Sequence, residues 1–166
     1  MNRIKKLGMS FVYAGRGIAY CIRHERNIRI HLVVLLYVLY FSNFYNFSRA
    51  EYALLVLTCA VVMALELINT AIEVVIDKVS PKFNVFAMMG KDIAAGGVLV
   101  GAIGSVIIGI ILFWNVEVFA DIFSYFTSAF YRPLILAATM VISVIFISKT
   151  KPRGGNASKI ISEKEK

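Results

Sequence analysis

Four long apolar runs dominate the sequence and restrict what it can fold into. They cover about residues 30–44, 52–76, 93–116 and 131–147. A membrane-spanning helix needs roughly 20 apolar residues, within a range of about 17–25. The second and third runs reach that length alone, whereas the first and fourth need their flanking residues. Because open strands leave backbone groups unpaired in lipid, we expect all four runs to be helices.

The composition supports a membrane protein. Hydrophobic residues make up 59% of the 166-residue chain, and charged residues make up 17%. A soluble domain usually has about 45–50% apolar and about 25% charged residues. We therefore predict an all-α integral membrane protein, with no room for a separate soluble enzyme.

The basic residues predict which ends of the helices face the cytoplasm. Of the 18 lysines and arginines, seven precede the first run, three lie between the second and third, and six follow the fourth. Segments rich in lysine and arginine remain in the cytoplasm. We therefore expect a multi-pass protein with its N- and C-termini in the cytoplasm. The net charge of +8 reflects this placement, and we expect no nucleic-acid partner.

The predicted architecture has four parts. They are a cytoplasmic arm with an amphipathic surface helix in residues 1–29, a three-helix membrane core in 30–116, an additional C-terminal membrane helix in 117–149, and a polar cytoplasmic tail in 150–166. The surface helix is predicted because apolar and basic residues alternate at helical spacing in residues 9–25. Residues 117–132 are aromatic and fit either an interfacial belt or the outer part of the fourth helix.

Three carboxylates share one face of the second run. A helix advances about 100° per residue, so Glu73 and Asp77 fall about 20° to either side of Glu66. Asn69 and Thr70 flank these carboxylates. The five residues form what we call the polar stripe, which begins within the bilayer and runs toward the cytoplasmic end of the helix.

Such a stripe indicates function, because an ionised carboxylate near the bilayer centre costs about 2.5–3.5 kcal/mol on insertion scales. No lysine or arginine lies in the interior of another run. A purely structural salt network would therefore lack its cations, and we expect Glu66 to have no cationic partner. A carboxylate in this position suits a general base that accepts a proton from an alcohol dissolved in lipid.

Four charged residues can join the stripe from the same side of the membrane. Glu25 precedes the first run, Lys91 and Asp92 directly precede the third, and Lys6 lies on the N-terminal arm. Magnesium favours a few carboxylate oxygens together with substrate phosphates, which Glu25 and Glu73 can provide. Lys91 can bind a phosphate as a point charge. This set of groups predicts phosphoryl transfer from a nucleotide to a lipid alcohol.

Three motifs, HERNIRIH, ELINTAIEVVID and GKDIAAGGVLV, resemble the prokaryotic diacylglycerol kinase family over about residues 3–116. The resemblance implies a homotrimer in a bacterial cell membrane, with three membrane helices and an amphipathic surface helix in each subunit. It also implies active sites between subunits, Mg²⁺ with ATP as co-substrate, and phosphorylation of a lipid alcohol.

The resemblance assigns roles to individual positions. Glu66 is expected to be the catalytic base, and Glu25 and Glu73 are expected to bind the metal. Asn69 falls at the polar position beside the base, where lipid substrate binds. The nucleotide site is expected to include Glu25 and Glu73 together with Tyr13, Asp77, Lys91, Asp92 and Lys6.

The lipid substrate is less closely specified. The pattern E-R-N-x-x-x-H at residues 25–31 resembles the Gram-positive branch, which includes undecaprenol kinases. We therefore favour undecaprenol, with undecaprenyl phosphate as product. Diacylglycerol, giving phosphatidic acid, is the alternative. An alternative of another class is a small ion or proton carrier that uses Glu66 and Glu73 as relay groups, but the helix before Glu66 offers almost no polar groups for a path.

Two features of the third and fourth runs concern packing. Gly97, Gly101 and Gly104 predict a helix-packing face. The chain departs from the family pattern after Val116, and we interpret the fourth helix as a remnant or a packing element. It contains no histidine, which excludes a histidine-dependent phosphatase there.

Overall fold

The computed structural model describes residues 3–150, and every regular element within them is a helix. Its elements are α1 (Arg3–His24), α2 (Arg26–Phe41), the short 3-10 helix η1 (Ser42–Phe44), α3 (Arg49–Val79), α4 (Val85–Phe113), α5 (Val116–Thr127) and α6 (Tyr131–Ser148). Four stretches are long and apolar enough to cross a membrane: Arg26–Phe44, α3, α4 and α6. The predicted all-α membrane fold is thus confirmed. Of the predicted tail, residues 151–166 lie outside the described part of the chain.

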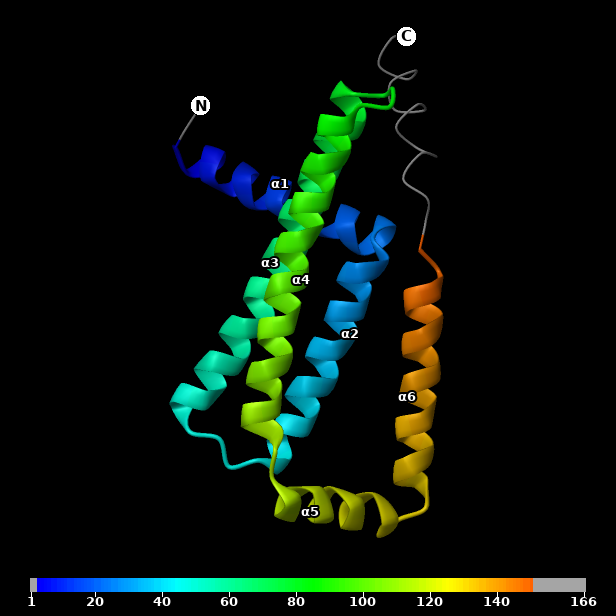
Figure 1. Ribbon diagram of the computed structural model, residues 1–166. Coiled ribbons are helices and arrows are strands. Elements are labelled where there is room, and N and C mark those ends of the chain that lie inside the picture. The colour runs from blue at the N-terminus through cyan, green and yellow to red at the C-terminus, as the bar shows by residue number, and fades with distance from the viewer. Residues whose placement is uncertain (1–2, 151–166) are drawn as a thin grey trace.

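The long helices run side by side (Figure 1). The helix α5 lies across one end of them, whereas α1 meets α3 and α4 partway along their length. The N-terminal helix α1, the turn between α3 and α4, and the C-terminal end of α6 lie in the same half of the molecule, and the α3–α4 turn extends beyond the other two. The loop between α2 and α3 and the helix α5 lie at the other end. Residues 117–132 therefore do not extend the fourth membrane helix. Most of them form the separate helix α5, which agrees with the interfacial interpretation.

Two membrane helices begin earlier than the sequence predicts. α4 starts at Val85 because the Asn84 side chain caps it, with Oδ1 accepting hydrogen bonds from the amides of Phe86 (2.9 Å) and Ala87 (3.4 Å). Lys91 and Asp92 therefore lie inside the helix, and their predicted position directly before it is wrong. α2 likewise starts at Arg26.

The tightest approach between α3 and α4 is at Gly101. A Cβ atom added at Gly101 would lie 2.5 Å from Leu65 Cδ1, whereas one added at Gly97 or Gly104 would meet nothing within 4 Å. The predicted glycine packing face therefore exists within the chain only at Gly101, where the missing side chain lets the helices approach.

Aromatic residues join the helices at the end of the molecule opposite α1. The Tyr45 hydroxyl donates a hydrogen bond to the carbonyl of Phe113 (2.8 Å), and the Tyr52 hydroxyl donates one to the carbonyl of Ser42 (3.3 Å). Burial raises the pKa of Tyr45, which keeps its hydroxyl protonated as a donor. Phe47 packs against the Tyr45, Tyr52 and Phe113 rings. Such aromatic belts are typical of the membrane interface.

α2 presents opposite faces to α3 and α6. His31 approaches α3, whereas the Tyr37 hydroxyl donates a hydrogen bond to Thr139 of α6 (3.1 Å). A cavity of about 370 Å³ between α2, α5 and α6 is lined on the α2 side by Val33, Leu36, Tyr37 and Tyr40. At about 100° per residue, these four lie roughly 140–240° around the helix from His31. α6 is thus behind α2 as seen from the polar stripe.

Candidate active site

The polar stripe runs along α3 from a buried to an exposed environment. Glu66 is 3% exposed, Asn69 is 8% exposed and Thr70 is 3% exposed. Glu73 is half-buried and Asp77 is exposed. Glu66 and Asp77 are eleven residues apart, or about 17 Å along a helix at about 1.5 Å per residue. One helix therefore carries polar groups from the buried interior toward the aqueous end.

Glu66 has a partner that the sequence analysis did not predict. His31 Nε2 on α2 lies 3.3 Å from Glu66 Oε1, which makes an ion pair when the imidazole is protonated. The expectation that Glu66 lacks a cationic partner overlooked His31, which is a cation only when it is protonated. It considered lysine and arginine, but imidazole can be protonated too. A neutral His31 with its proton on Nε2 can donate a hydrogen bond to the same oxygen.

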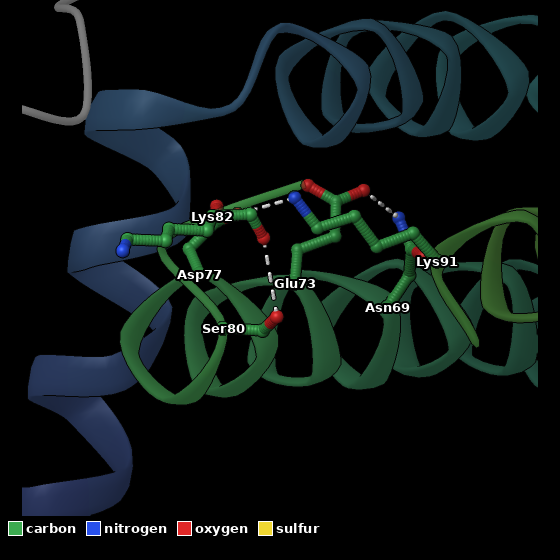
Figure 2. A network of polar contacts seen from close by, with 6 residues as sticks. All are labelled: Asn69, Glu73, Asp77, Ser80, Lys82 and Lys91. Atoms are coloured by element: carbon green, nitrogen blue, oxygen red, sulfur yellow. Dashed lines mark hydrogen bonds and ion pairs between the residues drawn. The ribbon is translucent and has the colours of Figure 1, made fainter. Parts of the chain in front are cut away.

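Asn69 holds the next carboxylate of the stripe. Its Nδ2 donates a hydrogen bond to Glu73 Oε1 (3.0 Å), one helical turn further along α3 (Figure 2). The Oδ1 atom of the same amide is buried and has no hydrogen-bond partner within the described residues. A buried acceptor without a partner is costly. Asn69 therefore orients Glu73 and leaves one oxygen for a group that the isolated chain does not provide.

Lys91 and Asp77 join α4 to the exposed end of the stripe. The Lys91 ammonium group forms an ion pair with Asp77 Oδ1 (Figure 2). Both side chains are partly exposed, so this end of the stripe is open to solvent. Lys82 follows in the turn after α3, where its carbonyl accepts a hydrogen bond from Ser80 (3.3 Å). The position of Lys91 within α4 is what directs its side chain across to α3.

Glu25 lies where α1 ends and α2 begins. Its backbone is extended (φ −107°, ψ 123°), and it is the residue that precedes the first turn of α2. Its amide donates a hydrogen bond to the carbonyl of Cys21 (2.8 Å), which ties it to the end of α1. Its side chain is half-buried. We call residues 22–28, which surround this change of direction, the elbow.

Three other predicted residues are exposed in the single chain. Tyr13 and Lys6 lie on α1, where the Arg16 guanidinium carbon is 5.9 Å from the Tyr13 ring centre. Asp92 lies next to Lys91 on α4. The structure does not bring these three side chains against the stripe, and their part in a nucleotide site stays a prediction.

The oxygen donors of the site fit magnesium chemically. Within residues 3–150, no group of three or more His, Cys, Asp or Glu side chains could hold a metal ion. Magnesium does not require such a group, since it is often bound by one or two carboxylates plus substrate phosphates. Glu73, held by Asn69, supplies a carboxylate, and Asn69 Oδ1 supplies a buried oxygen without a partner.

Comparison with known proteins places this site in a family. The sequence model of the family described as prokaryotic diacylglycerol kinase matches residues 12–113. This range contains every predicted site residue except Lys6. It ends where α4 ends, so α5 and α6 lie outside the match.

Three relatives show how far the similarity extends. The undecaprenol kinase of Bacillus subtilis (strain 168) is 38% identical over 112 residues, which cover 68% of this chain and 91% of the relative. The diacylglycerol kinase of Synechocystis sp. is 40% identical over 102 residues, covering 61% of this chain and 58% of the relative. The diacylglycerol kinase of Escherichia coli (strain K12) is 26% identical over 103 residues, covering 62% and 84%.

Proposed function

The chain belongs to the prokaryotic diacylglycerol kinase family and is an integral membrane lipid kinase with ATP as co-substrate, and we propose that its substrate is undecaprenol. The observation that carries the proposed chemistry is the polar stripe. It places Glu66 in the buried part of a membrane helix and Asp77, paired with Lys91, at the aqueous end. A lipid alcohol and a nucleotide can therefore approach one site from two phases.

The reaction assigns a separate task to each end of the stripe. Glu66 removes the proton from the lipid hydroxyl as its oxygen attacks the γ-phosphorus of ATP. The bond from the γ-phosphorus to the bridging oxygen breaks, and ADP leaves with the bonding electrons. His31, 3.3 Å from Glu66, holds the base toward the reacting hydroxyl. Asn69, beside the base, binds the lipid substrate.

The nucleotide is held at the cytoplasmic end. Glu25 and Glu73 would bind Mg²⁺, which neutralises charge on the phosphates when bound. Lys91 exchanges its pairing with Asp77 for a phosphate oxygen. Asp77, Asp92, Tyr13 and Lys6 complete the nucleotide site. These roles follow the family's pattern, and the arrangement of Asn69, Glu73, Asp77 and Lys91 in the structure supports them.

Undecaprenol is favoured by the extent of the similarity. The Bacillus subtilis relative, named undecaprenol kinase, is matched over 91% of its length at 38% identity. The Escherichia coli relative, named diacylglycerol kinase, is only 26% identical. The Synechocystis relative is 40% identical, but over 58% of its length. Diacylglycerol therefore remains the alternative substrate.

The proposal includes the environment of the enzyme. We place it in the bacterial cell membrane as a homotrimer, with residues 30–116 as the kinase core and both termini in the cytoplasm. The position of α1, the α3–α4 turn and the end of α6 in the half of the molecule opposite α5 supports this orientation (Figure 1), because these segments are the basic ones.

A competition assay tests the substrate. The purified full chain receives equal amounts of undecaprenol and diacylglycerol with Mg²⁺ and ATP labelled at the γ-phosphate, and the labelled lipids are separated. We expect most label in undecaprenyl phosphate. Glu66→Gln should lower both products about 10²–10⁴-fold while nucleotide binding persists. A majority of label in phosphatidic acid would show that the substrate is diacylglycerol, and normal turnover by Glu66→Gln would overturn the assignment of the base.

A further inference from the structure

One buried arginine connects three helices. Arg29, in the first turns of α2, is 7% exposed. Its Nε donates to the carbonyl of Ile22 (2.5 Å) and its Nη2 to that of Arg23 (3.2 Å), both in the last turn of α1. Its Nη1 donates to the carbonyls of Phe146 (2.5 Å) and Lys149 (3.1 Å) at the end of α6. We call these four hydrogen bonds the Arg29 clamp.

The clamp satisfies groups that helices leave unpaired. The last four carbonyls of a helix have no partner within it, and they carry the negative end of the helix dipole. Arg29 supplies donors and a positive charge to two such ends together. The Phe146 ring adds a cation–π contact, with its centre 4.8 Å from the guanidinium carbon. Lysine could not replace Arg29, because an ammonium group lacks the planar fork of five donors.

α6 is connected to the kinase core through α2. It lies behind α2 as seen from the polar stripe, and its hydrogen bonds to α2 come from Arg29 and Tyr37. These two residues are eight positions apart, so α6 is held at both the cytoplasmic end and the middle of α2. Its position keeps α6 away from the reacting groups. The Arg29 hydrogen bonds thus give α6 a direct connection to the elbow.

We propose that Arg29 is a positioning residue, through which α6 fixes the elbow and thereby the orientation of Glu25. The clamp holds Ile22 and Arg23 on one side of Glu25 and is anchored by Arg29 on the other side. Without it, the elbow can change the angle between α1 and α2, and the Glu25 carboxylate moves with it. α6, outside the family match, thus serves the nucleotide site. The role given to Glu25 rests on the proposed function.

Substitutions on both sides of the clamp test this proposal in the full chain. Arg29→Gln should raise the KM for Mg-ATP about tenfold, with kcat and the KM for lipid changed less than about twofold. Phe146→Leu, on α6, should change the Mg-ATP KM in the same direction but less. Arg29→Lys should fall between Arg29→Gln and wild type. The control is Arg49→Gln, an exposed arginine in the first turn of α3 and outside the elbow, which should leave all parameters at wild-type values.

Hydrogen exchange gives a readout that does not depend on activity. Arg29→Gln and Phe146→Leu should speed exchange at the elbow, including the amide of Glu25, and leave the centre of α3 unchanged. Faster exchange throughout the protein, or an equal loss in both KM values and kcat, would overturn the positioning role. Unchanged exchange at the elbow would overturn the clamp. If wild type has no kinase activity, the proposed function fails, and exchange alone decides on the clamp. If Arg29→Gln does not fold, Phe146→Leu gives the same decision.

Discussion

At the residue scale, His31 is the least expected part of the site. It stands on α2 and reaches Glu66 on α3, 35 positions further along the chain. The buried face of a membrane helix offers few partners to a carboxylate. Whether His31 is neutral or protonated, its contact limits how the Glu66 carboxylate can rotate. His31 can therefore orient Glu66 without itself contacting the substrate.

His31→Gln tests this role. Glutamine lacks the rigid ring that places a nitrogen atom 3.3 Å from Glu66 Oε1, so we expect kcat to fall about tenfold, equivalent to about 1.4 kcal/mol in the barrier. The KM for Mg-ATP should stay near its wild-type value, since the nucleotide end of the stripe is intact. His24→Gln is the matched control, because His24 stacks on Tyr20 and donates a hydrogen bond from Nδ1 to the Tyr20 carbonyl within α1. Equal kcat values for His31→Gln and wild type would argue against the role.

At the element scale, the pairing of α3 with α4 brings Lys91 to Asp77. The two helices approach closely where Gly101 faces Leu65. Nearer the α3–α4 turn, a Cβ on Gly90 would lie 3.2 Å from Ile76 Cδ1, a second tight approach beside Lys91. Packing on the apolar side of the helices thus sets the distance between the charged groups.

Gly101→Val and Gly97→Val form a matched pair that tests this packing. Valine at Gly101 must displace Leu65, and overpacking of this kind costs about 1–3 kcal/mol. We expect a lower melting temperature in detergent and weaker Mg-ATP binding for Gly101→Val. Gly97→Val adds the same group where the chain leaves open space, so it should melt like wild type. A larger loss at Gly97 would instead indicate that another subunit packs there.

At the scale of the whole molecule, one chain leaves much apolar helix surface uncovered. In the most apolar 18-residue stretch of α4, 6% of the residues are buried, and in the corresponding stretch of α3 the share is 28%. Lipid can cover such surfaces, but the small residues along α4 also suit close packing against another helix. The exposed positions of Tyr13 and Lys6 fit a nucleotide site that is completed by a neighbouring subunit.

Native mass spectrometry of the full chain in detergent tests the oligomer. We expect a dominant species of three 18.5 kDa chains in the preparation that carries activity. Glu66→Gln, although inactive, should show the same species, because Glu66 pairs within its own chain. An active preparation composed only of monomers would rule out the trimer and the shared nucleotide site.

The sequence by itself determined the membrane helices and the polar stripe, because both depend on local physics. Apolar length makes a spanning helix, and helical periodicity places Glu66, Asn69 and Glu73 on one face. The family motifs lie in the same local segments, so the kinase could be identified from them.

Only the tertiary structure decided what meets across helices. The pairing of His31 with Glu66, the bond of Lys91 to Asp77, and the Arg29 clamp join residues 6 to 120 positions apart. Periodicity shows which face a residue occupies but not which helix lies opposite. The sequence analysis also placed the start of α4 too late. The polar Gly90–Asp92 stretch interrupts the apolar run, but the helix continues through it to the cap at Asn84.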